Sequence, residues 1–118
     1  MGFLSGLFGK KNGRYETYHE NGQLKVRYTY AAGKPDGPCE SYYENGQLKA
    51  KSTYMAGELG GPYELYHENG QLRLRGTYDM GVKCGEWIEE KTTGFFVGKK
   101  ITDTETYDPC PPGLADGN

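Results

Sequence analysis

Residues that could do chemistry recur along this 118-residue chain at multiples of 24 positions. Carboxylates stand at Glu16, Glu40 and Glu64, and imidazoles stand at His19 and His67. Paired carboxylates serve as acid and base in glycoside hydrolysis, and imidazoles ligate metals or transfer protons. A third set combines basic and aromatic side chains, which can stack nucleic-acid bases or hold a lipid headgroup. Its members are Lys25, Arg27, Lys49, Lys51, Arg73 and Arg75, interleaved with Tyr18, Tyr42 and Tyr66.

The phrase Glu-Asn-Gly-Gln-Leu sets the period of the chain, because it occurs at 20–24, 44–48 and 68–72. Asn-Gly between short runs rich in Tyr, Thr, Val and Leu is typical of a two-residue type I′ hairpin turn, whose central residues both need positive φ. A second, glycine-bearing connection leads to the next unit, and so many glycines disfavour a helix. The sequence therefore predicts β-hairpins that repeat every 24 residues.

A two-residue turn at Asn21-Gly22 determines which residues face each other across each hairpin. The expected pairs are Glu16 with Arg27, Thr17 with Val26, Tyr18 with Lys25, His19 with Leu24, Glu40 with Lys51, Tyr42 with Lys49, Glu64 with Arg75 and Tyr66 with Arg73. A longer turn around Glu-Asn-Gly-Gln would change these partners. With the two-residue turn, one face of the sheet is charged and aromatic, and the other carries Leu, Val, Ala and further Tyr side chains.

This arrangement argues against catalysis and metal binding. In a meander, His19 and His67 lie four strands apart, about 19 Å at roughly 4.8 Å per strand, which is too far for one metal ion. Each of the three repeated glutamates faces an Arg or Lys, which lowers a carboxyl pKa, whereas a general acid needs a raised one. We therefore expect no catalytic residue, no metal ligand and no cofactor, and we interpret both histidines as ordinary surface residues.

The composition favours a thin sheet over a thick core. Leu, Ile, Val and Phe together account for only 18 of the 118 residues, although 11 Tyr and 1 Trp add apolar area. The net charge of -2 gives no general attraction to nucleic acid or to acidic membranes, so we expect no nucleic-acid partner. No apolar run approaches the roughly 20 residues that cross a bilayer.

The cysteines bear on the cellular location of the protein. The chain has three cysteines, Cys39, Cys84 and Cys110. Their number is odd, no two of them form a CxxC motif, and no secretory signal precedes them. Cysteines without these features are simplest to explain in a reducing compartment. We therefore expect a cytoplasmic protein.

We divide the chain into an apolar N-terminal segment (1–12), a repeat domain (13–107) and a tail rich in Pro and Gly (108–118) that we expect to be extended or disordered. The units of the repeat domain are 13–36, 37–60, 61–84 and a degenerate unit, 85–107. Trp87 occupies the register of Tyr15, Cys39 and Tyr63, and we expect it to help close the array.

The N-terminal segment differs from everything after it. Its apolar residues fall at helical spacing and precede two lysines; they are Phe3, Leu4, Leu7, Phe8, Lys10 and Lys11. Three interpretations stay open: a frayed start, an apolar cover over the first strand, or a contact with a membrane surface or a partner.

The repeated unit Tyr-x-x-Tyr-x-x-Asn-Gly-Gln-Leu-Lys, followed by Thr-Tyr-x-x-Gly, carries a resemblance over about residues 13–94. It resembles the MORN repeat variant of bacterial antitoxin-like proteins of the YwqK type. The resemblance implies an all-β fold, an elongated single-layer antiparallel meander of hairpins, without catalytic residues. It also implies an antitoxin or immunity-like protein that binds a cognate toxin. The defining residues of the family are structural; here they are Tyr18, Asn21, Gly22, Leu24, Tyr30, Gly33 and Gly37 with their equivalents.

We therefore expect a non-enzymatic module that binds a protein, a toxin if the resemblance extends to function, as a monomer or an edge-paired dimer. Tyr and Arg are enriched at interaction hot spots. The candidate partner-binding residues are Tyr18, Arg27, Tyr42, Lys51, Tyr66 and Arg75. Exposed strand edges offer a second docking mode, by β-augmentation. The alternative is a peripheral membrane scaffold that touches lipid weakly through Phe3, Leu4, Leu7 and Phe8.

Overall fold

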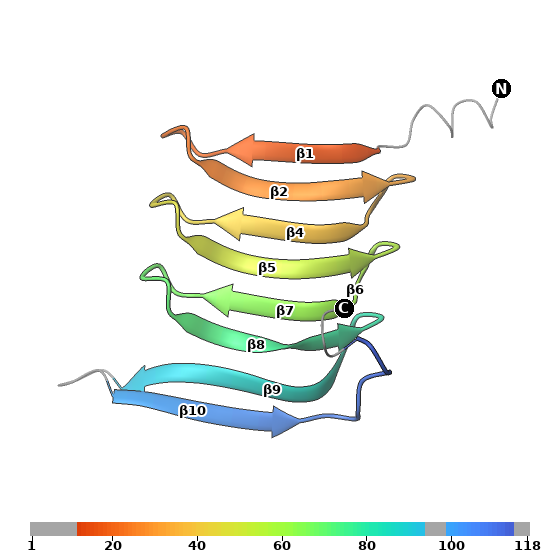
Figure 1. The fold of residues 1–118 in the computed structure, drawn as a ribbon. Helices are drawn as coiled ribbons and strands as arrows, with labels where there is room; N and C mark the ends of the chain where they lie inside the picture. Colours follow the sequence, from red (N-terminus) through yellow and green to blue (C-terminus); the bar gives the residue numbers. More distant parts are fainter. Residues whose placement is uncertain (1–11, 94–98, 115–118) are drawn as a thin grey trace.

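The computed structural model describes residues 12–93 and 99–114, which form one open antiparallel sheet (Figure 1). Its long strands follow one another in space as they do in sequence: β1 (Gly13–Tyr18), β2 (Leu24–Ala31), β4 (Gly37–Tyr42), β5 (Leu48–Met55), β7 (Gly61–Tyr66), β8 (Leu72–Asp79), β9 (Val82–Thr93) and β10 (Lys99–Thr106). Two short strands, β3 (Lys34–Pro35) and β6 (Glu58–Leu59), pair with β2 and β5. The predicted all-β meander of repeated hairpins is confirmed.

The molecule is thin and elongated. Its principal extents are 64 × 41 × 20 Å and its radius of gyration is 17.3 Å, compared with roughly 13.5 Å for a compact domain of this length. Among the described residues, the buried hydrophobic side chains are Cys84 and Trp87. No helix in the described chain is long and apolar enough to cross a membrane. Stability therefore depends on strand pairing and on local clusters, because residues 12–93 and 99–114 form no second layer of secondary structure over the sheet.

The Asn-Gly turns differ from the prediction. His19 N–H donates to the Gln23 carbonyl at 2.8 Å, and Gly22 N–H donates to the His19 carbonyl at 2.9 Å. The loop therefore has three residues, and Gly22 is the one at positive φ, +90°. The Asn21 side chain explains why: its Oδ1 accepts the Gln23 N–H at 2.9 Å, which fixes an Asx turn at negative φ. A three-residue loop of this kind combines a type I turn with a following positive-φ glycine.

The type I′ turns lie in the second connection of each unit. Ala32 and Gly33 have φ values of 53° and 81°, and Ala31 pairs with Lys34 across them. The same geometry recurs at Ala56-Gly57 and Met80-Gly81. A side chain 20 residues earlier supports two of these strained positions, because Asn12 Oδ1 accepts the Ala32 N–H at 2.9 Å and Asp36 Oδ1 accepts the Ala56 N–H at 3.0 Å.

The three-residue turn changes part of the predicted register. Glu16 faces Arg27 and Thr17 faces Val26, as predicted, and the counterparts Glu40–Lys51 and Glu64–Arg75 also hold. A bulge follows, so the predicted Tyr18–Lys25 and His19–Leu24 pairs are wrong. The tyrosines face leucines instead: Tyr18 faces Leu24, Tyr42 faces Leu48 where Lys49 was predicted, and Tyr66 faces Leu72 where Arg73 was predicted.

Side chains at the three-residue turns tie neighbouring units together. Asn21 Nδ2 donates to the Glu44 carbonyl at 2.8 Å, and Asn45 Nδ2 donates to the Glu68 carbonyl at 2.9 Å. His19 Nε2 lies 2.8 Å from the Tyr42 carbonyl oxygen. The Tyr43 hydroxyl occupies the equivalent place one unit later and donates to the Tyr66 carbonyl at 2.7 Å. His19 and Tyr43 therefore have the same structural role, because each side chain contacts a backbone carbonyl of the next unit.

The C-terminal end is held against the sheet. Cys84 forms a disulfide with Cys110, and Gly85 exchanges backbone hydrogen bonds of 2.8 Å with Tyr107 and Asp108. The tail as far as Leu114 is therefore ordered on the sheet, whereas the sequence predicted an extended or disordered tail. The disulfide joins two of the three cysteines from which a reducing compartment was expected, and the cytoplasmic location stays a prediction. Cys39 is the free cysteine of the described chain. The predicted apolar contacts Phe3, Leu4, Leu7 and Phe8, with Lys10 and Lys11, lie outside the described residues.

Candidate interaction surface

One face of the sheet carries a row of charges that alternate in sign across six strands. We call it the charge row; its members, from β1 to β8, are Glu16, Arg27, Glu40, Lys51, Glu64 and Arg75. Each residue faces its neighbours in the row through the strand register, both within a unit and between units. Three carboxylates and three cations make the row formally neutral. The register ends the row at Ile88 on β9, which faces Arg75.

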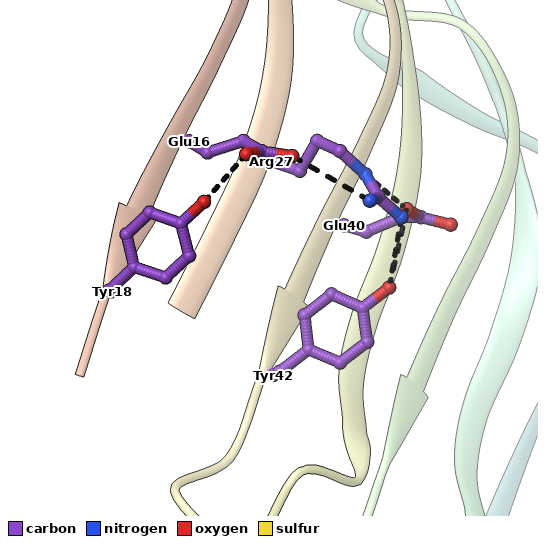
Figure 2. Close-up of polar contacts among 5 residues, drawn as sticks. All are labelled: Glu16, Tyr18, Arg27, Glu40 and Tyr42. Carbon is purple, nitrogen blue, oxygen red and sulfur yellow. Dashed lines mark hydrogen bonds and ion pairs between the residues drawn. The ribbon is translucent and has the colours of Figure 1, made fainter. Parts of the chain in front are cut away.

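At the N-terminal end of the charge row, one guanidinium joins two carboxylates (Figure 2). Arg27 Nη2 lies 2.7 Å from Glu40 Oε1, its Nε donates to the same oxygen at 3.2 Å, and its Nη1 lies 3.8 Å from Glu16 Oε2. The hydrogen bond from Arg27 lowers the pKa of Glu40, and the same bond raises the pKa of Arg27. Glu40 is therefore held ionised, which suits a structural anion and opposes a role as a general acid.

The tyrosines next to the charge row are anchored through their hydroxyls. The Tyr18 hydroxyl donates to Glu16 at 2.7 Å, the Tyr42 hydroxyl to Glu40 at 3.3 Å and the Tyr66 hydroxyl to Glu64 at 2.9 Å. The bond to Glu16 is the main cause of the raised pKa of Tyr18, whereas burial is the main cause for Tyr42 and Tyr66. Tyr18 is still 57% exposed. The rings are thus fixed in place on an open surface.

The structure brings all six sequence-predicted partner-binding residues onto this face. Arg27, Lys51 and Arg75 are members of the charge row, and Tyr18, Tyr42 and Tyr66 lie beside its glutamates. Lys51 and Arg75 are exposed, and Arg27 is partly covered by Tyr42 and Glu40. Their positions agree with a shared surface, and their role in binding stays a prediction.

A second row on the same face, made of Thr and Pro, was not predicted from the sequence. It runs beside the charge row from Thr29 through Pro38, Thr53 and Pro62 to Thr77, with Arg14 at its β1 end. Shallow hollows of about 380 Å³ open over it. The signal that could have found the row is the 24-residue spacing of Thr29, Thr53 and Thr77.

The opposite face carries two aromatic clusters. In the first, Tyr15 stacks on Tyr28 with ring centroids 5.8 Å apart, and Tyr30 meets both rings edge-on. In the second, Trp87 lies 5.0 Å from the Tyr78 ring and 6.0 Å from the Tyr63 ring, between centroids. The Lys83 ammonium lies 4.7 Å from the Trp87 centroid. These clusters supply the apolar burial that the aliphatic residues do not.

Metal ligands do not gather in the part of the chain that the structure describes, where no three His, Cys, Asp or Glu residues could hold an ion. The His19 ring nitrogen Nε2 instead contacts the backbone carbonyl oxygen of Tyr42 in the next unit. The repeated glutamates are tied to cations or phenols rather than to one another.

A scan against protein-family models matches the MORN repeat variant at residues 11–32, 35–55 and 59–80. The matched segments together make up more than half of the chain and coincide with the three hairpin units that carry the charge row. The chain belongs to the MORN repeat variant family. MORN repeats commonly act as modules that bind proteins or membranes. No curated protein and no solved structure matches the chain significantly.

Proposed function

We propose that this MORN repeat protein is a non-enzymatic module that binds another protein through the charge row and its tyrosines. The observation that supports this most directly is the alternation of charge across six strands, beside rings that are fixed by hydrogen bonds. A neutral alternating row offers no continuous attraction to a polyanion, so it favours a partner with its own patterned charges over nucleic acid. Anchored Tyr rings give contact area at low entropic cost.

The finer form of the proposal is an antitoxin or immunity-like protein of bacteria that neutralises a cognate toxin in the cytoplasm. The resemblance of the repeat to YwqK-type proteins supports it, together with an extended rigid surface that can cover a partner. The sheet has β1 and β10 as its outer strands, so the module acts as a monomer or as a dimer paired at these edges.

The experiment is affinity capture with the tagged full chain from a lysate of its source cells, followed by mass spectrometry. The antitoxin hypothesis predicts one stoichiometric protein whose expression alone stops growth, and co-expression of this chain restores growth. A captured protein that is harmless to the cell would contradict the antitoxin role and leave protein binding in place. Recovery of no protein by the wild-type chain would contradict the proposal as a whole.

A second candidate is a peripheral membrane scaffold. The sequence of the N-terminal segment, with Phe3, Leu4, Leu7 and Phe8 ahead of Lys10 and Lys11, supports it. Co-sedimentation with vesicles that contain anionic lipid measures this contact. A membrane role predicts that the full chain pellets with vesicles and that deletion of residues 1–11 abolishes pelleting. Equal pelleting of both chains would contradict a contact through this segment.

A further inference from the structure

The first strand of the sheet repeats the strands that open the next two units. β1, β4 and β7 share a glutamate at their fourth position, a tyrosine at their sixth and the Glu-Asn-Gly-Gln-Leu phrase that follows. Each pairs with the next strand in the same register, with a bulge before the tyrosine. β4 and β7 have a preceding unit beside them, whereas the described residues place no strand beyond β1 (Figure 1).

The outer edges of β4 and β7 show what such a strand accepts from a preceding unit. In both places a glutamate faces a cation, and the residue after it faces an apolar side chain. The pairs are Glu40 with Arg27 and Ser41 with Val26 at β4, and Glu64 with Lys51 and Leu65 with Ala50 at β7. Each of these glutamates therefore has a cation on both sides in the strand register, one from the preceding unit and one from its own hairpin.

Glu16 has a cation in register on one side, Arg27 of its own hairpin. Figure 2 shows that this guanidinium reaches across the unit boundary instead: Nη2 lies 2.7 Å from Glu40 Oε1, whereas Nη1 lies 3.8 Å from Glu16 Oε2. The closer ion pair is thus the one between units. It is the partner from a preceding unit that Glu16 lacks in the described chain.

Turn residues of the preceding unit add polar contacts at the same edge. The Tyr42 carbonyl oxygen lies 2.8 Å from His19 Nε2, and the Glu44 carbonyl accepts a hydrogen bond from Asn21 Nδ2 at 2.8 Å. The equivalent carbonyls of the first unit are those of Tyr18 and Glu20. Because the register and the turn geometry repeat, these two carbonyls point away from β2 and offer acceptors to an added segment.

The solvent exposure of the three strands records the missing neighbour. Five of the six residues of β1 are exposed, compared with one of six in β4 and none in β7. Tyr18 is 57% exposed, whereas Tyr42 and Tyr66 are half-buried. β1 therefore has the residues of an internal strand and the exposure of an edge.

β1 differs from both later strands at two positions. Arg14 stands where β4 and β7 have proline, so β1 keeps a backbone N–H that proline lacks. Thr17 stands where they have Ser41 and Leu65, and it is a residue type common in strands. Neither difference obstructs an added strand.

We infer that the outer edge of β1 binds an extended strand of the partner protein, antiparallel to β1, with an Arg or Lys facing Glu16 and an apolar residue facing Thr17. This inference rests on the proposed protein-binding function and names the chemistry of the partner. Backbone hydrogen bonds supply affinity, and the cation selects the partner and its register.

The charge at this edge favours a partner over the chain itself. The residue 24 positions before Arg27 is Phe3, which is not a cation. In a second copy, the strand register continues the charge row from Arg75 through Ile88 to Thr104 on β10, which is not a cation either. A basic strand from another protein supplies what both lack.

The test is an NMR titration of the isotope-labelled full chain with an unlabelled, acetylated peptide that has the sequence of residues 19–31. This peptide contains the strand and the turn side chains that β4 accepts in the sheet. We expect saturable shifts of the Glu16, Thr17 and Tyr18 amides with one peptide bound. Amides of β10, such as that of Thr104, should not shift.

Charge variants test the facing cation. A peptide with Glu in place of its Arg should bind the wild-type chain about fivefold or more weakly. In the full chain with Glu16→Lys the preference should reverse, so that the Glu peptide binds more tightly than the Arg peptide. Glu68→Lys makes the same charge change at an exposed turn residue and should leave the wild-type preference unchanged.

The inference is overturned if millimolar peptide shifts no β1 amide of the full chain, which is also the result expected if residues 1–11 cover this edge. Equal affinity of the wild-type chain for the Arg and Glu peptides overturns it as well. Sedimentation velocity examines the remaining occupant: a dimer of the full chain that the peptide dissociates would assign the edge to a second copy and overturn the inference.

These results are distinct from a failure of the proposed function. If only the inference fails, a captured protein partner binds Glu16→Lys as tightly as the wild type and still loses affinity when the three tyrosines beside the charge row are removed.

Discussion

Trp87 packs directly against Gly76, and this contact buries the indole ring in a sheet that has no thick hydrophobic core among its described residues. A Cβ atom at Gly76 would lie 2.0 Å from Trp87 Cδ2, and Trp87 is only 2% exposed. The Trp87 indole N–H is shared between the carbonyls of Thr77 and Cys84, at 3.1 and 3.2 Å. One unit earlier the equivalent positions hold Ser52 and Tyr63. In the last repeat, Gly therefore replaces Ser, and the space that this opens is filled by the larger Trp ring in place of Tyr.

We predict that Gly76→Ala lowers the free energy of unfolding by about 2–3 kcal/mol, because the added methyl group displaces the buried indole. Urea unfolding followed by circular dichroism measures it. The matched control is the double variant Gly76→Ser with Trp87→Tyr, which rebuilds the Ser52–Tyr63 arrangement. It should be more stable than Gly76→Ser alone, and a Gly76→Ala variant as stable as wild type would contradict the packing.

The ion pair of Glu40 with Arg27 predicts a pH dependence of stability. Arg27 holds the pKa of Glu40 below its ordinary value of 4.5, so the folded state is stabilised by the ionised carboxylate. This contribution is complete above about pH 4.5 and is lost as the pH falls through the lowered folded pKa. Urea unfolding between pH 7 and pH 3 should show a smaller loss of stability in Glu40→Gln than in wild type. Glu68→Gln, at an exposed turn, is the control, and equal acid sensitivity of Glu40→Gln and wild type would refute the contribution.

At the scale of strands and turns, the repeated hairpins could be predicted because a 24-residue period with two glycine-bearing connections leaves few alternatives. The turn type could not, since the Asn21 side chain bonds the Gln23 N–H and so keeps Asn21 at negative φ. Pairs before the bulge, such as Glu16 with Arg27, were therefore predicted correctly. The partner of Tyr18, which follows the bulge, was predicted incorrectly. The disulfide could not be predicted because its two cysteines meet only after β10 reverses the chain.

The type I′ turns offer a test at this scale. Ala32 has a φ of 53°, a conformation that Asn tolerates better than Ala. We predict that Ala32→Asn raises the free energy of unfolding by about 0.5 kcal/mol. Ala31→Asn, one residue earlier in β2, has no such strain to relieve and should not be stabilising. Thermal and urea unfolding compare the two, and a destabilised Ala32→Asn would show that the turn is not type I′ in solution.

At the scale of the whole molecule, stability is distributed unevenly. The hairpin units contact mainly their neighbours, so their contributions add along the sheet as in other repeat arrays. The buried hydrophobic side chains of the described chain, Cys84 and Trp87, both lie on β9, and Cys84 itself forms the disulfide with Cys110. The C-terminal unit is therefore the cap on which the open hairpins depend.

Loss of the disulfide should weaken that cap. It closes a segment with a sequence separation of 26, for which the loss of loop entropy in the unfolded chain amounts to about 3.5 kcal/mol. We predict that Cys110→Ser lowers the free energy of unfolding by about 2–4 kcal/mol, and that reducing agent has the same effect on the wild type. Cys39→Ser is the control: the difference in free energy of unfolding between this variant and the wild type should be the same with and without reducing agent. A wild-type midpoint that reducing agent does not change would argue against the Cys84–Cys110 bond in solution.

The most direct test of the proposed function is a calorimetric titration of the captured protein partner into the wild-type chain and into the triple variant Tyr18→Ala, Tyr42→Ala, Tyr66→Ala. Thr17→Ala, an exposed change on the opposite face of β1, is the control, and circular dichroism verifies that each variant folds. We predict one partner per chain, unchanged affinity in the control and a loss of at least about 100-fold in the triple variant. A folded triple variant that binds as tightly as the wild type would show that the charge-row face is not the binding surface.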